Sequence, residues 1–235
     1  MPEPMRHGKP AERKLGIGPL VRRAFGRHER RISEIYRRAF IDLDALVASI
    51  RGSVNAPAEI LEIGCGDGLM TERIALAFPA SSVTGIDICN QPGRLYRGAR
   101  ARVRFLRISL EELSEAECAR YQLVIISDVL HHVPHREWQR FLGSAATFLA
   151  DGGTLILKDW VRELTPAYMF GFLSDRLVTA DRIRYAHESE LKALAYATFG
   201  ADAIRLEFRI KPWHCNLALV ISPKTRASVN GDGQG

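Results

Sequence analysis

The sequence lacks the long apolar stretch that a membrane-spanning helix needs. Its 235 residues contain no run of about 18 uncharged apolar residues, so we expect no transmembrane helix. The N-terminal residues carry charges but no continuous apolar core followed by a small-residue cleavage site, so we expect no secretory signal. These absences favour a cytoplasmic protein with one domain large enough to bury a core.

Cysteine is also scarce. The four cysteines stand at positions 65, 89, 118 and 215, with no CxxC pair and no histidine at the spacing of a zinc site. We therefore expect reduced thiols rather than a disulfide framework or a zinc centre.

Acidic residues are outnumbered only at the N-terminus. Residues 1–38 hold 11 Lys or Arg and 4 Asp or Glu, whereas the rest of the chain holds 22 and 23. We expect segment 1–28 to be flexible, and its charge leaves open peripheral contact with an anionic membrane surface. A nucleic-acid partner is not expected, because residues 1–38 carry a net charge of +7 and the rest of the chain carries −1, so the basic character does not belong to the body. Six arginines from Arg94 to Arg107 are expected to form a solvated face, with anionic lipid or RNA as alternatives.

The apolar pattern predicts one α/β domain over residues 29–223, followed by a flexible tail at 224–235. Apolar residues at helical spacing predict a cap helix over 29–51. Between the strands that follow we expect helices, most clearly at Leu69–Phe78 and His135–Leu149, and a turn at Asp151-Gly152-Gly153. This alternation predicts a Rossmann-like, doubly wound sheet that is mostly parallel. The five predicted strands are Glu59–Gly64, Ser82–Asp87, Val103–Ile108, Gln122–Asp128 and Thr154–Trp160.

The alternation stops after the fifth strand. Residues 162–186 form an apolar insertion, which we interpret as a lid, and a helix is expected at about 188–199. Two further strands, Ala201–Ile210 and Cys215–Ser222, are separated by four residues only. We therefore expect them to form an antiparallel hairpin.

A glycine-rich loop, Glu62-Ile63-Gly64-Cys65-Gly66-Asp67-Gly68, follows the first strand. Its glycines let the backbone turn tightly and approach a ligand, and open parallel sheets bind ligands at the carboxyl ends of their strands. The spacing is G-x-G-x-G rather than the G-x-G-x-x-G of dinucleotide enzymes, and carboxylates at Glu62 and Asp67 repel a pyrophosphate. Both features favour S-adenosylmethionine, which carries a positive ammonium and a positive sulfonium.

Asp87 ends the second strand, 19 residues after Gly68. That distance corresponds to one helix plus one strand, so we expect its carboxylate beside the loop, where it can accept hydrogen bonds from both ribose hydroxyls. The alternative is that Asp87 only caps a helix.

These motifs, with Gln122–Val133 and Asp151–Leu155, resemble the successive motifs of class I S-adenosylmethionine-dependent methyltransferases, in the small-molecule and natural-product branch. The resemblance covers residues 57–160 and implies a seven-stranded sheet with one antiparallel strand in a C-terminal hairpin. At Ser109 the sequence departs from the family, which usually places an Asp there for the adenine amino group; the contact then comes from Ser109, from Leu110 or from neither. The residues implied to hold S-adenosylmethionine and its product S-adenosylhomocysteine are Glu62, Gly64, Cys65, Gly66, Asp67, Gly68, Asp87, Ile88, Ser109, Leu110 and Ser127.

Candidate catalytic residues follow the fourth strand. Asp128 is expected either to orient the substrate or to cap the next turn. His131 and His132 point in different directions, so at most one of them serves as a general base, and structural packing is the alternative for both. No metal is expected, because no acidic ligand cluster accompanies these histidines.

The resemblance places the cap helix and the insertion over the substrate. We therefore expect methyl transfer by in-line displacement to a small, largely apolar metabolite, at an oxygen, nitrogen or carbon acceptor. The alternatives are an RNA or protein methyltransferase and a non-catalytic cofactor-binding scaffold, and the oligomeric state is left open. The predicted pocket residues are Tyr36, Phe40, Trp160, Tyr168, Met169 and Phe172.

Overall fold

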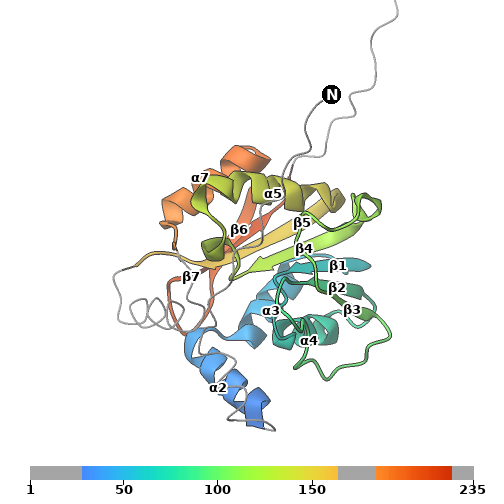
Figure 1. Cartoon of the computed structure of the whole chain (residues 1–235). Coiled ribbons are helices and arrows are strands. Elements are labelled where there is room, and N and C mark those ends of the chain that lie inside the picture. The colour runs from blue at the N-terminus through green and yellow to red at the C-terminus, as the bar shows by residue number, and fades with distance from the viewer. Residues whose placement is uncertain (1–27, 164–183, 224–235) are drawn as a thin grey trace, which may run out of the picture.

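The computed structural model of the chain describes residues 28–163 and 184–223 (Figure 1). Within these ranges the α-helices are α2 (Glu29–Phe40), α3 (Leu43–Ser53), α4 (Leu69–Ala77), α5 (Trp138–Thr147) and α7 (Glu188–Phe199). The strands are β1 (Glu59–Ile63), β2 (Ser82–Ile86), β3 (Val103–Leu106), β4 (Tyr121–Ser127), β5 (Leu149–Trp160), β6 (Ile204–Arg209) and β7 (Asn216–Ile221). Short 3-10 helices are η2 (Glu115–Glu117), η3 (Leu130–His132) and η4 (His135–Glu137).

The strands form one seven-stranded sheet in the order β3-β2-β1-β4-β5-β7-β6. Strand β7 runs antiparallel to both of its neighbours, and the remaining pairings are parallel. The predicted sheet, its single antiparallel strand and its terminal hairpin are therefore confirmed. The strand order reverses between β1 and β4, so the loops after these two strands diverge and leave room for a ligand at their carboxyl ends.

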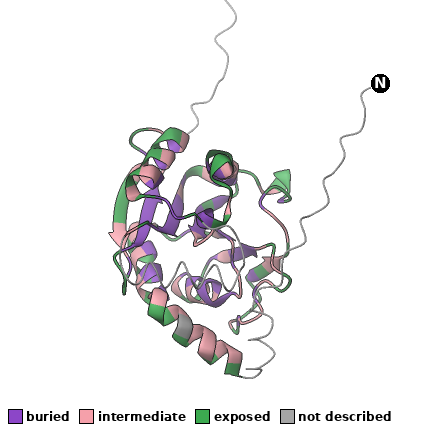
Figure 2. Cartoon of the chain, turned by 60° about the vertical axis from the view of Figure 1, so that its left-hand side comes forward, coloured by how far each residue is buried: buried purple, intermediate pink, exposed green. Residues whose placement is uncertain are grey.

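Helices α3 and α4 cover one face of the sheet, and α5 and α7 cover the other (Figure 1). Side chains alternate between the faces along each strand, so Ile60 joins the core under α3 and α4 while Leu61 joins the core under α5 and α7. Buried residues accordingly concentrate on the strands and on the inner sides of these helices (Figure 2). None of the described helices is long and apolar enough to span a membrane.

The prediction of a single cap helix over 29–51 was wrong in one respect, because the structure has two helices there, α2 and α3. The break falls at Ile41, whose backbone is extended, and at Asp42, whose carboxylate accepts a hydrogen bond from the Ala45 amide at 2.9 Å. Asp42 is thus the N-cap of a new helix. Its own amide donates to the Lys211 carbonyl at 2.7 Å, which fixes the junction against the β6–β7 turn.

Two further predictions differ from the structure. The helices expected on either side of β3 are absent, because residues 87–102 join β2 to β3 through turns and bends, and residues 107–120 join β3 to β4 with only the short η2. The expected turn at 151–153 lies inside β5, where the pairing with β4 shifts register and Gly152 has a φ of 69°. Most of the insertion 162–186, together with the segments before His28 and after Pro223, lies outside the described residues.

Candidate active site

The glycine loop joins β1 to α4 at the carboxyl edge of the sheet. Gly64, Gly66 and Gly68 have φ values of 78°, 52° and 85°, a region that glycine adopts without a steric penalty. The amides of Gly64 and Cys65 donate to the Ile86 carbonyl at 2.8 and 3.1 Å, which ties the loop to the end of β2. The predicted tight turn is therefore present.

Asp87 lies against this loop, as its spacing predicted. One carboxylate oxygen accepts a hydrogen bond from the Gly66 amide at 2.8 Å, and the other accepts one from the Cys89 amide at 2.7 Å. The side chain of the next residue, Ile88, is 54% exposed, which is unusual for a large apolar group. The pair presents a carboxylate and an apolar surface side by side.

Glu62 behaves differently from the sequence interpretation. Its side chain is buried and accepts a hydrogen bond from the Thr71 hydroxyl of α4 at 2.6 Å. Burial raises the pKa of Glu62 to about 8, against the opposing effect of that hydrogen bond. Near neutral pH this residue is mainly an uncharged acid that fastens the loop to α4, so the acidity of the site rests on Asp67 and Asp87.

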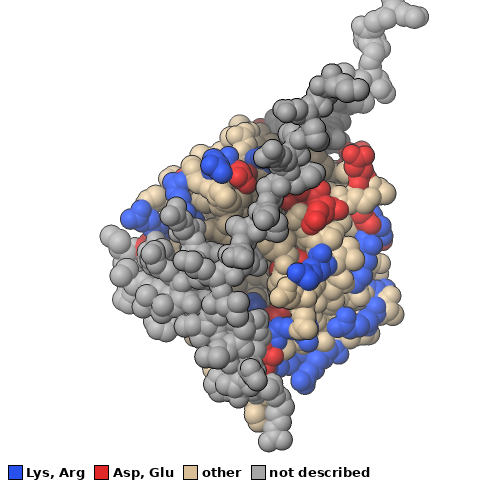
Figure 3. Space-filling model, in the orientation of Figure 1, with Lys and Arg blue, Asp and Glu red and all other residues tan. Residues whose placement is uncertain are grey.

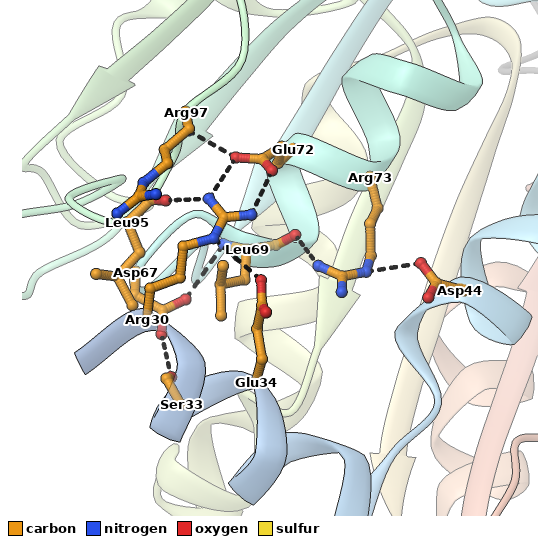
Figure 4. Close-up of polar contacts among 10 residues, drawn as sticks. All are labelled: Arg30, Ser33, Glu34, Asp44, Asp67, Leu69, Glu72, Arg73, Leu95 and Arg97. Carbon is orange, nitrogen blue, oxygen red and sulfur yellow. Dashed lines mark hydrogen bonds and ion pairs between the residues drawn. The ribbon is translucent and has the colours of Figure 1, made fainter. Parts of the chain in front are cut away.

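Residues of helix α2 contact the Asp67 side chain of the glycine loop (Figure 4). The Asp67 carboxylate pairs with the Arg37 guanidinium at 2.9 Å and accepts a hydrogen bond from the Ser33 hydroxyl at 3.2 Å. Its other oxygen accepts the Leu69 amide at 3.2 Å, at the start of α4. One carboxylate therefore connects α2, the glycine loop and α4.

Arg30 makes a second connection between α2 and the rest of the site (Figure 4). Its guanidinium donates to both carboxylate oxygens of Glu72 at 2.6 and 3.0 Å, and to the Leu95 carbonyl at 2.8 Å. Glu72 also accepts the Arg97 amide at 2.6 Å. Segment 93–97 in turn supports the glycine loop, because the Leu95 amide donates to the Asp67 carbonyl at 2.8 Å.

The glycine loop with its Asp67, together with Asp87 and Ile88, forms what we call the cofactor cradle, and these residues fit S-adenosylmethionine. A Cβ added at Gly66 would meet no atom within 4 Å, so the loop backbone there faces open space. Asp87 beside it has lone pairs for hydroxyl donors, and the exposed Ile88 offers apolar contact for a ring. At the expected adenine side, the Ser109 amide donates to Glu112 at 2.7 Å and the Leu110 side chain is buried in the core.

A cavity of about 380 Å³ adjoins the cradle behind Asp67. It is bounded by the α2–α3 junction, the start of α4 and the β6–β7 turn, and none of the predicted site residues lines it. Two of its charged residues, Arg37 and Arg73, already pair with Asp67 and Asp44. The cavity therefore borders the cofactor cradle without containing its polar groups.

The loop after β4 is fixed by two consecutive residues of β5. Lys158 donates to the Asp128 carboxylate at 2.5 Å, and the Lys158 carbonyl accepts the Asp128 amide at 3.0 Å. Asp159 holds His131 through the ring nitrogen Nδ1 at 2.6 Å and through the His131 amide at 3.1 Å. Burial acts to raise the pKa of Asp159, but the charge and hydrogen bond of His131 outweigh it, so the pKa is lowered and the carboxylate stays ionised.

The three predicted catalytic residues differ in exposure. The Asp128 side chain is 35% exposed, His131 is buried, and His132 is exposed. The two imidazole rings nevertheless lie against each other, with centroids 4.2 Å apart, so the structure does not bear out the expectation that the histidines point in different directions. Among the described residues, no group of three or more His, Cys, Asp or Glu side chains could hold a metal ion.

A row of aromatic rings borders this loop. Phe40 lies 5.9 Å from Trp160, Trp160 lies 6.3 Å from Tyr185, and Tyr185 lies 4.9 Å from His131, measured between ring centroids. The structure thus brings together the predicted pocket residues Phe40 and Trp160. The predicted residues Tyr168, Met169 and Phe172 lie outside the described residues, as does the side chain of Tyr36.

Sequence reasoning missed Tyr185, Lys158 and Asp159. Tyr185 lies at the end of the predicted insertion, where no pattern marked it. Lys158 and Asp159 carried a signal, because two adjacent charges interrupt an otherwise apolar strand. A buried charge is retained in a core only with a partner, so these two residues pointed to partners on the neighbouring strand.

Several of the arginines between positions 94 and 107 form ion pairs or ring contacts within the protein. Arg94 pairs with Glu29, Arg104 pairs with Glu117 at 2.7 Å, and Arg100 lies over the Phe105 ring at 5.5 Å. Lys and Arg side chains are visible over the α4 and β3 side of the molecule (Figure 3). The expected solvated face is therefore also a network that ties α2 and the loops to the sheet.

Comparison with known proteins identifies the family. The pattern described as a methyltransferase domain matches residues 27–205. The ubiquinone biosynthesis O-methyltransferase of Dechloromonas aromatica is 29% identical over 147 residues, which cover 58% of this chain and 61% of that relative. This chain thus matches somewhat under two thirds of the relative's length.

Two solved structures share the fold. The 1,6-didemethyltoxoflavin-N1-methyltransferase of Burkholderia thailandensis, with bound 1,6-didemethyltoxoflavin and S-adenosylhomocysteine, has a TM-score of 0.62 at 17% identity, covering 95% of this chain and 94% of its own. An O-methyltransferase from neocarzinostatin biosynthesis, in complex with S-adenosylmethionine and 2-hydroxy-5-methyl naphthoic acid, has a TM-score of 0.57 at 17% identity, covering 75% and 52%. With a family match over most of its length, the chain belongs to the methyltransferase-domain family as a class I S-adenosylmethionine-dependent methyltransferase.

Proposed function

We propose that this chain transfers a methyl group from S-adenosylmethionine to a hydroxyl oxygen of a small, largely apolar aromatic compound. The observation that carries the proposal is the row of rings from Phe40 to His131, which ends at the polar loop after β4. Trp160, Tyr185 and His131 are themselves buried, whereas Phe40 at the other end of the row is partly exposed. Flat rings bind other rings by offset and edge contacts and exclude water, so an aromatic acceptor fits against this row. The name of the sequence relative supports an oxygen acceptor, since it is a ubiquinone biosynthesis O-methyltransferase. Of the two fold neighbours, one is an O-methyltransferase in complex with a hydroxy-naphthoic acid and the other is an N1-methyltransferase.

The bound cofactor supplies a methyl group that is already activated by its sulfonium charge. The protein then has to hold the acceptor in line, which can contribute about 7 kcal/mol or more to lowering the barrier. Asp128 is the group best placed for this, because its carboxylate is partly exposed while His131 is buried against Asp159. A substrate hydroxyl that donates a hydrogen bond to Asp128 turns an oxygen lone pair toward the methyl group.

Asp128 also accepts the proton in this proposal. As the new carbon–oxygen bond forms, the hydroxyl becomes a protonated ether, which is far more acidic than a carboxylic acid. The proton therefore passes to the Asp128 carboxylate without a stronger base. In this arrangement His131 and Asp159 anchor the loop, with four bonds in total linking it to β5.

The test is transfer of labelled methyl from S-adenosylmethionine into a panel of phenols, aliphatic alcohols and aromatic amines, with tRNA and a protein extract as further arms. We expect label in phenols, with the methyl group assigned to oxygen by NMR. Label only in amines contradicts the oxygen acceptor. Label only in tRNA or protein favours the macromolecular alternative. Cofactor binding without any transfer favours a non-catalytic scaffold.

A further inference from the structure

We infer that Lys158 is a positioning residue that holds the Asp128 carboxylate in place beside the acceptor. The inference rests on the proposed function, because Asp128 is the group assigned to the acceptor hydroxyl. Lys158 was absent from the site predicted from the sequence. Its ammonium lies at 2.5 Å from an Asp128 carboxylate oxygen.

The burial of Lys158 is not required by the fold. The side chain is 0% exposed, and it lies on the same side of β5 as Ile156, which packs in the core under α3 and α4. An apolar side chain of similar length could pack there, and replacing a buried ion pair by apolar residues often leaves stability unchanged or higher. A buried ammonium in this position therefore points to a role beyond packing.

The backbone of Asp128 gives a second, independent indication. Asp128 has a φ of 57°, in the left-handed region that non-glycine residues rarely adopt. Such strain persists where surrounding contacts enforce it, and it concentrates at functional sites. Lys158 supplies two of these contacts, one from its ammonium to the carboxylate and one from its carbonyl to the Asp128 amide at 3.0 Å.

The pair is asymmetric with respect to solvent. The ammonium is fully enclosed, whereas 35% of the Asp128 side chain is exposed. Lys158 therefore does not reach the substrate itself, and the pair presents only its carboxylate to the site. The second carboxylate oxygen accepts the Ser127 hydroxyl at 3.1 Å, which further limits rotation of the group. Lys158 acts on the reaction through the orientation of Asp128.

The experiment compares Lys158→Met with the double variant Lys158→Met/Asp128→Asn. The double variant removes both charges, and Asn tolerates the left-handed backbone, so it should fold and bind S-adenosylhomocysteine within about threefold of the native protein. Lys192→Met is the control, because Lys192 pairs with Glu188 and Glu207 on the surface. The readouts are unfolding temperature, cofactor affinity, kcat and KM for the acceptor, and amide hydrogen exchange of residues 128–132.

For Lys158→Met we expect kcat to fall about tenfold or more, with cofactor affinity retained and faster exchange of residues 128–132. The double variant should show a similar or larger loss of kcat, and Lys192→Met should match the native protein. A native kcat in the double variant, or unchanged exchange in Lys158→Met, overturns the inference even if the hydroxyl acceptor is correct. If the native protein methylates no hydroxyl compound, the proposed function fails separately, and the exchange data still decide whether Lys158 holds the Asp128 loop.

Discussion

The ion pair between Arg30 and Glu72 should control how α2 closes over the cofactor cradle. No described side chain of α2 is fully buried, and among those described the apolar contact with the core comes from Phe40 at the end of the helix, which packs against Trp160. Its place depends on polar contacts, of which the Arg30 fork is the most extensive, with bonds to Glu72, Glu34 and the Leu95 carbonyl. We predict that Arg30→Met releases α2 while the sheet remains folded.

The magnitude follows from the geometry of the pair. The Arg30 and Glu72 side chains are 18% and 14% exposed, so solvent screens them less than an ordinary surface pair. Two charge-assisted bonds in such a setting correspond to a coupling of about 1–2 kcal/mol. If α2 must dock for the cofactor to be retained, the Kd for S-adenosylhomocysteine should rise about 5- to 30-fold.

The assay is a double-mutant cycle of Arg30→Met and Glu72→Gln, measured by calorimetric titration of S-adenosylhomocysteine. Arg73→Met is the matched control, because Arg73 pairs with Asp44 at 2.8 Å and connects α4 to α3 rather than to α2. The hydrogen bond from Arg30 lowers the pKa of Glu72 from 4.5. The coupling should therefore be present above pH 4.5 and disappear as the pH falls through the folded pKa. This explanation of how α2 is held would be refuted if the two substitutions changed the binding free energy additively at pH 7. An equal loss of affinity in Arg73→Met would also refute it.

Three further predictions concern the cradle itself. Burial raises the pKa of Glu62 to about 8, so the stability that its neutral form confers is present below pH 4.5 and is lost as the pH rises through 8. The free energy of unfolding should fall by up to about 1.4 kcal/mol per pH unit over this window. Glu62→Gln should flatten this slope in denaturant titrations, and an unchanged slope would contradict the assignment. Ala strains the backbone at both Gly64 and Gly66, which have positive φ, but a Cβ at Gly64 would also lie 2.2 Å from Val129, whereas one at Gly66 meets no atom within 4 Å. Gly64→Ala should therefore lower the unfolding temperature more than Gly66→Ala, and Gly66→Ala should also weaken cofactor binding; equal unfolding temperatures would contradict this expectation. Asp87→Ala should weaken cofactor binding by about 1–3 kcal/mol in calorimetry, and unaltered affinity would reduce Asp87 to a support for the loop.

The cofactor half of the site could be predicted from the sequence because its signals are local. The glycine loop, its distance to Asp87 and the strand pattern all lie within short segments whose geometry follows from the backbone. The charge of Glu62 could not be predicted in this way, since its burial depends on α4 packing over the end of β1. A carboxylate in a loop motif appears charged until the enclosing helix is known.

Long-range polar contacts account for most of what the sequence did not predict. Arg30 and Glu72 are 42 positions apart, and Lys158 and Asp128 are 30 positions apart. Each residue alone resembles an ordinary surface charge, and only the fold shows that the partners meet. The division of the cap helix had a local signal in Asp42, but the continuous apolar stripe on both sides of it favoured one helix.

The alternation of β5 explains how one strand can serve both sides of the active site. Successive strand residues point to opposite faces, so Lys158 and Asp159 reach the loop after β4 from the two sides of the sheet. One contact fixes the Asp128 carboxylate, and the other fixes His131 at the end of the aromatic row. The loop between them is therefore fastened to β5 at both of its ends. If the proposed acceptor site is correct, a substitution at Phe40 should alter which compound is methylated, whereas the contacts of Asp128 and His131 with β5 should stay as they are.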